Sequence, residues 1–201
     1  VQSLGILVTP KLKLRTVQDL IAYAKANPGK VNFASSGNGS AQHLAGEAFR
    51  TAAKIEMVHV PYKGTGPAMT DLLAGRVDVM FSSLVGNMEH VNEGRLNLVA
   101  TTGAKRNPVT PNVPTVAESG LPGYEAGTWQ AVLAPAGTPA PVVERLNAAI
   151  AKAAKSPRIV ETLAAQGMEV RTSSPDALRD MLKKDSGEYQ VLLKHTKTTL
   201  Q

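Results

Sequence analysis

Short apolar runs and helical patterns alternate through the first half of the chain, and this alternation constrains the fold more than any other feature of the sequence. Strand patterns occur at residues 4–9, 31–35, 56–60, 77–81 and 96–102. Helical patterns lie between them, at residues 17–27, 41–53, 67–74 and 84–92. Elements that alternate in this way favour a largely parallel sheet with helices on both faces. The sequence therefore predicts an α/β fold.

Local signals mark the ends of two of these helices. Thr16 followed by Asp19 resembles a capping box, with Asp in place of the usual Glu or Gln, and Pro28-Gly29 stops the same helix. Pro67 suits the first turn of the helix predicted to contain it. Both signals support the alternation.

The chain changes character after residue 102. Residues 103–126 contain four prolines and predict a linker that wraps over a surface. The elements predicted after it are a strand at 127–134, helices at 140–154, 157–166 and 175–195, and a short strand at 168–172. This part has too little sheet to be an independent α/β domain. We therefore divide the chain into an α/β lobe at residues 1–124 and a segment at 125–201 that completes a second lobe.

A glycine-rich loop, SSGNGS, links the second predicted strand to the second predicted helix. The start of a helix has unsatisfied N–H groups and a positive dipole end, and Gly37 and Gly39 would let an anion approach the backbone closely. A tight turn with Ser40 as the helix N-cap explains the same residues equally well. Gln42 stands where a dinucleotide fingerprint requires its third glycine, and the lysine of a P-loop is missing. The loop is therefore either an anion site or a turn, but not a nucleotide motif.

Two further loops repeat this arrangement of strand, small residues and helix N-terminus. They are VPYKGTGP at residues 60–67 and FSSLVG at residues 81–86. Because the carboxyl ends of parallel strands line one edge of a sheet, where ligands usually bind, we expect the three loops to converge on a small anionic or polar ligand. Lys63 is the one cation in these loops and is equally well explained as a solvated side chain. So few fixed charges favour a carboxylate over a phosphate.

Catalytic and metal sites have little support. No G-x-S-x-G motif occurs, and a triad built on the serines near His43 needs an acid, for which Glu47 at i+4 is a candidate. Such a pair is more often structural, so we predict no catalytic residue and keep a hydrolase that uses Ser40 and His43 as an alternative. The four histidines, at positions 43, 59, 90 and 195, show no metal-ligand spacing. We predict no metal and no cofactor.

Trp129 is the only tryptophan, and it lies in the strand predicted after the linker. Core packing is its default role. Beside a cleft between two lobes it would instead form a wall of the ligand site, with Thr128 offering a hydroxyl group.

Composition narrows the classes of partner. The formal net charge is +6, but the basic residues are spread out and no aromatic residues interleave with the densest group, at residues 11–15, so nucleic-acid binding is not predicted. The chain contains no cysteine, which excludes disulfides and thiolate metal sites. No apolar run is long enough for a membrane helix.

Four sequence blocks, in this order, closely resemble the Bug-type receptors, the extracytoplasmic solute receptors of tripartite tricarboxylate transporters. The blocks are VNFASSGNGSAQHLAGEAF, HVPYKGTGPAMTDLLAGRVDVMF, NVPTVAESGLPGYEAGTW and LAPAGTPAPVVERLN. The resemblance implies a periplasmic binding protein-like fold of type II, with one complete lobe and the C-terminal part of the other. It also implies a periplasmic protein that closes on a small carboxylate without chemistry and delivers it to the membrane subunits of a transporter.

The resemblance further implies the ligand contacts. Ser82 stands where many relatives carry an acidic residue, which favours a plain carboxylate over an amino acid. The positions that match the ligand loops of the family are Ser36, Gly37, Asn38, Gly39, Ser40, His43, Gly64 and Thr65.

The resemblance places the chain in the last two thirds of such a receptor, with the leading ligand loop of the family before residue 1. We therefore expect the helices after residue 139 to expose an apolar face, which self-association or domain swapping would cover. A sensor that passes ligand occupancy to a signalling partner is the alternative to a transport receptor.

Overall fold

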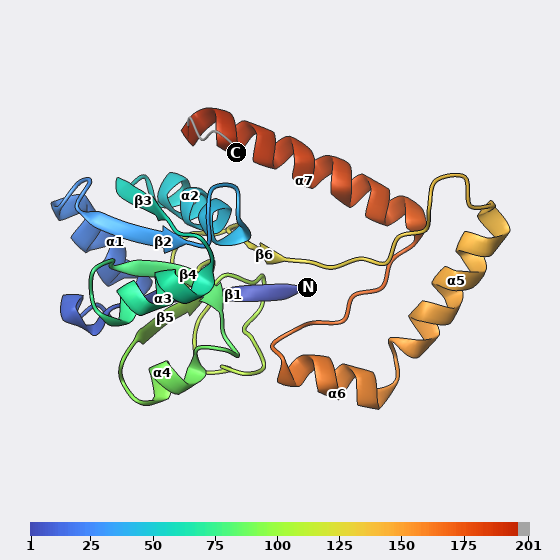
Figure 1. Cartoon of the computed structure of the whole chain (residues 1–201), viewed down its shortest axis with the longest axis horizontal. Helices are drawn as coiled ribbons and strands as arrows, with labels where there is room; N and C mark the ends of the chain where they lie inside the picture. The colour runs from blue at the N-terminus through green and yellow to red at the C-terminus, as the bar shows by residue number, and fades with distance from the viewer. Residues whose placement is uncertain (197–201) are drawn as a thin grey trace.

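One sheet with helices on both faces forms the first part of the molecule, and an arm of helices extends from it (Figure 1). The computed structural model describes the backbone of residues 1–196 and the side chains of residues 1–194. The side chain of His195, one of the four histidines, lies outside the described residues.

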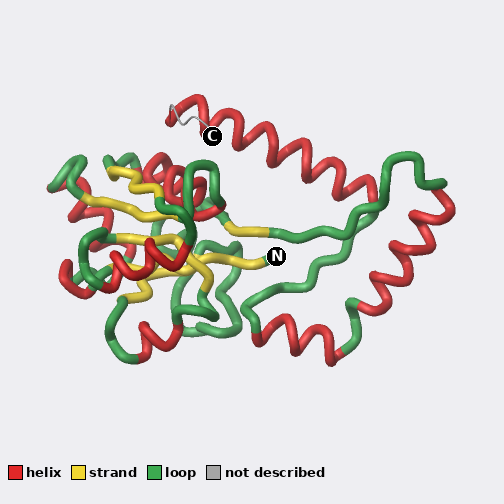
Figure 2. Tube along the Cα trace, viewed as in Figure 1, coloured by secondary structure: helices red, strands yellow, loops and turns green. Residues whose placement is uncertain are grey.

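The sheet has the strand order β3-β2-β4-β1-β5, with the two-residue β6 paired to β1 (Figure 2). β2 is parallel to both β3 and β4, whereas β1 is antiparallel to β4, β5 and β6. The strands are β1 (Gln2–Val8), β2 (Val31–Ser35), β3 (Met57–Pro61), β4 (Val79–Ser83), β5 (Asn97–Thr101) and β6 (Gly127–Thr128).

The expectation of a largely parallel sheet is therefore wrong for β1, which lies inside the sheet and runs against its neighbours. A strand buried on both faces reads as a continuous apolar run in either direction. Leu4, Ile6 and Val8 belong to the core on one face, and Leu7 belongs to the core on the other. β2, β3 and β4 remain parallel, so their carboxyl ends still meet at one edge.

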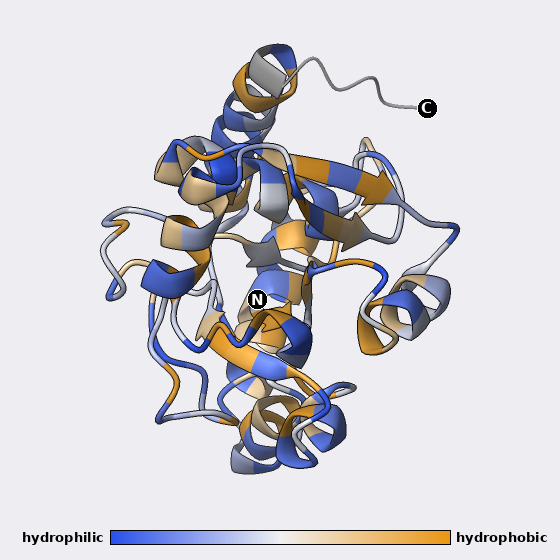
Figure 3. Ribbon diagram, turned by 90° about the vertical axis from the view of Figure 1, so that its left-hand side faces the viewer, coloured by the Kyte–Doolittle hydropathy of each residue, from blue (hydrophilic) through white to orange (hydrophobic). Residues whose placement is uncertain are grey.

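Helices cover both faces of the sheet, as predicted. α1 (Val17–Ala26) and α2 (Ala41–Ala53) pack on the face that contains Phe33, while α3 (Thr65–Leu73) packs on the face that contains Ala34. The short α4 (Met88–Asn92) lies at the β4–β5 connection, and a 3-10 turn, η1 (Pro10–Leu12), follows β1. In Figure 3 the strands between these helices are orange over much of their length, interrupted by blue polar residues. The capping box is also present, with Thr16 and Asp19 each accepting a backbone N–H of the other at 3.0 and 2.9 Å.

Residues 103–126 wrap over the sheet and α2 without a helix or strand, as expected from their prolines. Val116 and Tyr124 are buried in the core on the α1–α2 face. The Tyr124 hydroxyl donates to the carbonyl oxygen of Ala45 in α2 at 2.9 Å. The linker is thus part of the first folded unit.

Two strands predicted in the second part are wrong. β6 ends at Thr128, where the sequence pattern predicts a strand to residue 134, because β1 begins at Gln2 and no described strand lies opposite the next residues. The strand predicted at 168–172 is reduced to a single bridge between Met168 and Gln2. An extended segment becomes a strand only where a neighbour completes its hydrogen bonds.

The helices of the second part form an arm with exposed apolar side chains. α5 (Ala140–Ala153) and α6 (Pro157–Ala165) contain no buried residue, and α7 (Pro175–Thr196) returns over α2 (Figure 1). The exposed apolar face expected after residue 139 is therefore present. Its exposed large side chains on α5 and α6 are Val142, Leu146, Ile150, Ile159 and Val160. Among the described residues, no helix combines the length and apolar character needed to cross a membrane.

Candidate functional site

The loop between β2 and α2 makes a tight turn that two glycines permit. Gly37 and Gly39 have φ angles of +137° and +75°, in the region that residues with a Cβ rarely adopt. Ser40 caps α2, because its hydroxyl accepts the backbone N–H of His43 at 3.2 Å. The interpretation as a tight turn with Ser40 as N-cap is therefore confirmed, and the turn brings the N-terminus of α2 to the edge of the sheet.

The loop between β3 and α3 lies directly against this turn. The N–H of Gly64 donates to the carbonyl of Ser36 at 3.2 Å. Gln42 joins the two loops, since its Oε1 accepts the N–H of Ser36 at 2.8 Å and its Nε2 donates to Thr65 Oγ1 at 3.2 Å. The predicted convergence of these two loops is confirmed. Sequence reasoning missed Gln42, which it used only as evidence against a nucleotide motif.

Most N–H groups of the glycine loop are already used inside the protein. Those of Ser36, Gly37, Gly39 and Ser40 donate to Gln42 Oε1, Ser35 Oγ, His43 Nδ1 and the Gly37 carbonyl. The loop is therefore not a cradle of free amides. Asn38, at its tip, is exposed.

The available donors are the first-turn N–H groups of α2 and α3. No side chain caps α3, whose N-cap is Gly64 at φ +114°. Gly64 and Gly66 have open space where a Cβ would lie, and Thr65 between them is exposed. Two adjacent helix N-termini, one of them uncapped and open, favour a small anion through their dipoles and orphan donors.

The third predicted loop, after β4, is closed by its own side chains. Ser82 is 1% exposed, and its hydroxyl accepts from Asn87 Nδ2 at 3.2 Å. Asn87 Nδ2 also donates to the carbonyl of Ser83 at 2.6 Å, and Gln2 Nε2 donates to the Ser83 hydroxyl at 3.0 Å. A ligand contact by Ser82 stays a prediction, and it requires this enclosed hydroxyl to become accessible.

Thr128 and Trp129 lie at a different place from the two loops. They line a cavity of about 1080 Å³ between β6, the start of β1 and the helical arm, and no residue of the loops at 36–40 and 64–65 lines it. Trp129 is 37% exposed and donates from Nε1 to Asp185 at 2.9 Å, so it is not a core residue. Lys63 is exposed and has no ion pair among the described residues.

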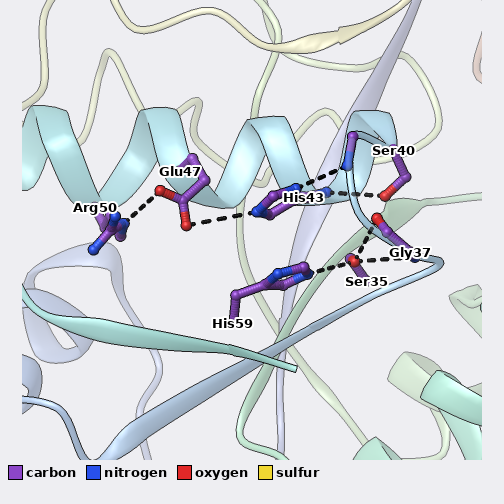
Figure 4. Close-up of polar contacts among 8 residues, drawn as sticks. Ser35, Gly37, Ser40, His43, Glu47, Arg50 and His59 are labelled. Atoms are coloured by element: carbon purple, nitrogen blue, oxygen red, sulfur yellow. Dashed lines mark hydrogen bonds and ion pairs between the residues drawn. The ribbon is translucent and has the colours of Figure 1, made fainter. Parts of the chain in front are cut away.

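A polar network lies behind the glycine loop (Figure 4). His43 from α2 and His59 from β3 stack with ring centroids 3.7 Å apart and an angle of 11° between the rings. Ser35 Oγ lies 2.6 Å from His59 Nε2. On the other side, Glu47 lies 3.8 Å from His43 and pairs with Arg50 at 2.7 Å.

Burial sets the protonation of this network. Burial, then the nearby His43 and Arg50, lowers the pKa of His59 to about 4, and burial with Arg50 also lowers the pKa of His43. Burial raises the pKa of Glu47 despite its bond to Arg50. Both imidazoles are therefore neutral at pH 7, which suits two stacked rings.

The geometry does not assemble a hydrolase from Ser40 and His43. The Ser40 hydroxyl accepts the backbone N–H of His43, while ring Nδ1 of His43 is occupied by Gly39. Ser35 does contact an imidazole but is 0% exposed, so a substrate cannot reach it. Within the described residues, no group of three or more His, Cys, Asp or Glu side chains could hold a metal ion.

The family of the chain follows from comparison with known proteins. A family model described as "Tripartite tricarboxylate transporter family receptor" matches residues 1–197. The chain belongs to this receptor family. Protein BugT of Bordetella pertussis is 40% identical over 199 residues, which cover 98% of this chain and 60% of BugT. A protein from the tcbD-tcbE intergenic region of Pseudomonas sp. strain P51 is 42% identical over 191 residues, covering 94% of this chain and 57% of that protein.

Solved receptors share the fold. A protein of R. palustris solved with adipate superposes with a TM-score of 0.83 at 33% identity, over 98% of this chain and 66% of that one. The periplasmic binding protein BugD has a TM-score of 0.79 at 32% identity, over 100% of this chain and 68% of BugD. MatC from Rhodopseudomonas palustris, solved with bound malate, has a TM-score of 0.76 at 28% identity, over 96% of this chain and 66% of MatC. The periplasmic binding protein-like fold and the resemblance to Bug-type receptors are confirmed.

The chain spans about three fifths of the length of these curated relatives. What the whole receptor binds and where it delivers its ligand are therefore matters for proposal. The division at residue 124 and the ligand contacts also stay predictions.

Proposed function

We propose that this chain forms one wall of a periplasmic receptor that binds a small organic carboxylate and delivers it to the membrane subunits of a tripartite tricarboxylate transporter. The observation that carries the proposal is the pair of helix N-termini, α2 and α3, which Gln42 holds side by side at the sheet edge. Two relatives with this fold were solved with the dicarboxylates adipate and malate.

The contacts we propose are exposed or half-buried residues of the two loops. The residues are Ser36, Gly37, Asn38, Gly39, Ser40, Gly64 and Thr65, with the first-turn N–H groups as donors. A carboxylate suits this site because it accepts several hydrogen bonds and gains from two dipoles without a buried cation. The site supplies no acidic side chain for an ammonium group, since Ser82 is neutral, so we propose a plain carboxylate over an amino acid.

A charge placed at the start of α3 tests the site. Gly66→Asp should weaken the binding of adipate or malate at least tenfold, because the new carboxylate repels the carboxylate of the ligand. The same charge stabilises the N-terminus of α3 through the helix dipole, so the loss of affinity is not a loss of helix. Gly66→Asn is the matched neutral control and should bind within threefold of wild type. Calorimetric titration of the intact protein with adipate, malate, aspartate and glutamate measures both the site and its preference. Equal binding by the Asp and Asn variants would refute the site, and tight binding of only the amino acids would refute the ligand class.

We also propose that the arm mediates self-association of the 201-residue chain. The exposed apolar side chains of α5 and α6 form a face without a buried residue, and such faces are usually covered by another surface. Sedimentation velocity should show dimers or larger species, and Leu146→Glu with Ile150→Glu should shift them toward monomer. A compact monomer for the unaltered chain contradicts this expectation.

A further inference from the structure

The glycine loop is anchored from behind by three side chains, of which Ser35 and His43 are buried. They are Ser35 at the end of β2, His43 in α2 and His59 in β3. We propose that these three are positioning residues, which hold residues 36–40 in the one conformation that opens the α2 and α3 N-termini to a carboxylate. The inference rests on the proposed function and assigns the stacked histidine pair a role in it.

His43 holds the second half of the turn from both of its ends. Its ring Nδ1 accepts the N–H of Gly39 at 3.0 Å, and its own backbone N–H donates to Ser40 Oγ at 3.2 Å. An acceptor at Nδ1 places the ring proton on Nε2, toward Glu47. Without that acceptor, the N–H of Gly39 loses its partner behind the loop and the φ angle of +75° loses its support.

Ser35 holds the first half of the turn. Its hydroxyl donates to the carbonyl of Gly37 at 3.0 Å and accepts the N–H of the same residue at 3.1 Å. The third contact joins Ser35 Oγ to His59 Nε2 at 2.6 Å. A hydroxyl has one proton, so His59 donates here when the Ser35 proton lies on the Gly37 carbonyl, and accepts when that proton points to the ring. In either direction His59 is the side chain from β3 that orients the Ser35 hydroxyl.

The stacked rings couple the two anchors. His43 and His59 are in face-to-face contact, and Phe33 packs against His59 with centroids 5.0 Å apart. Among the described residues, the charged groups that act on the pair are Glu47 and Arg50, both on α2. Because the two imidazoles stack, a shift of one displaces the other. His43 bonds to Gly39, and His59 acts on Gly37 through Ser35, so the two glycines are held as a unit.

Amide side chains provide a crossed test, because Asn places a polar atom near Nδ1 of histidine and Gln places one near Nε2. His43→Asn keeps an acceptor for Gly39, whereas His43→Gln does not. His59→Gln keeps a donor for Ser35, whereas His59→Asn is too short. At pH 7, we expect His43→Asn and His59→Gln to bind adipate within threefold of wild type, and His43→Gln and His59→Asn to bind it at least tenfold more weakly.

Two further measurements on the intact protein separate positioning from general stability. Hydrogen exchange by NMR should show faster exchange of the Gly39 N–H in His43→Gln and of the Gly37 N–H in His59→Asn, with both amides protected in the two conservative variants. Urea unfolding of all four variants should not rank them in the order of their affinities. If wild type binds adipate and all four variants bind equally, or if affinity follows only the free energy of unfolding, the inference is overturned. If wild type binds neither adipate nor malate, the proposed function fails instead.

Discussion

Replacing Gly46 with alanine is expected to lower the free energy of unfolding by about 2 kcal/mol, although the same change inside a helix normally stabilises by up to about 1 kcal/mol. A Cβ at Gly46 would lie 2.4 Å from Cε2 of Phe33. Phe33 is 0% exposed and packs against His43, His59 and Phe81, so its ring has no free space to enter. Close packing turns a favourable helix substitution into an overpacked core.

Urea unfolding measures this effect, and the chain contains its own control. Gly66 also lies within a helix, α3, but nothing lies within 4 Å of where its Cβ would be. Gly66→Ala should therefore leave the stability unchanged or raise it. Phe33→Leu replaces the ring with a smaller side chain. The Gly46→Ala, Phe33→Leu double variant should therefore lose less free energy of unfolding than the sum of the two single changes. Equal effects of alanine at positions 46 and 66 would contradict the argument.

Acid is expected to destabilise the fold through the histidine pair. The pKa of His59 is lowered to about 4 by burial, His43 and Arg50, whereas an unfolded histidine titrates near its ordinary value of 6.5. Between these values the unfolded state binds more protons, so the stabilisation is complete above pH 6.5 and is lost as the pH falls toward 4. The full difference corresponds to about 3 kcal/mol, and because His59 is only partly buried we expect solvent screening to leave about half of it.

The measurement is the free energy of unfolding at several values between pH 7 and pH 4, for wild type and His59→Gln. Wild type should lose about 1.5 kcal/mol more over this range than the variant, which cannot titrate at this position. Glu47 acts in the opposite direction, because its pKa is raised by burial and the folded state takes up its proton first. That contribution is present in both proteins, so it cancels in the comparison. Parallel profiles would show that His59 is not the group responsible.

Much of the first folded unit could be predicted from local sequence patterns. The capping box at Thr16 and Asp19 is present, and the helices cover both faces of the sheet. These features depend on residues a few positions apart, such as an N-cap and the N–H three residues later. The exposed face of α5 and α6 was also predictable, because an amphipathic helix presents its apolar stripe whether or not a partner covers it.

Strand direction and strand length were not predictable in the same way. β1 runs antiparallel between β4 and β5, and β6 stops after two residues. Both outcomes depend on which segment lies opposite in the sheet. An apolar run in the sequence does not indicate which strand will be its neighbour or in which direction that strand runs. The role of Trp129 was unpredictable for a similar reason. Core packing is the default role of a lone tryptophan, but Trp129 lines the cavity and donates a hydrogen bond to Asp185 in α7.

The site divides along the same line. The sequence alone determined where the turn lies and which residues must be glycine, because a positive φ and a helix N-cap are local properties. Only the tertiary structure decided which amides of that turn are free. Ser35 meets His59 across 24 positions, and Gln42 meets Thr65 across 23. Those distant contacts orient Ser35 and Gln42, whose oxygens accept the N–H groups of Gly37 and Ser36. The starts of α2 and α3 remain as the donors, since a backbone N–H that already has a partner cannot serve a ligand as well.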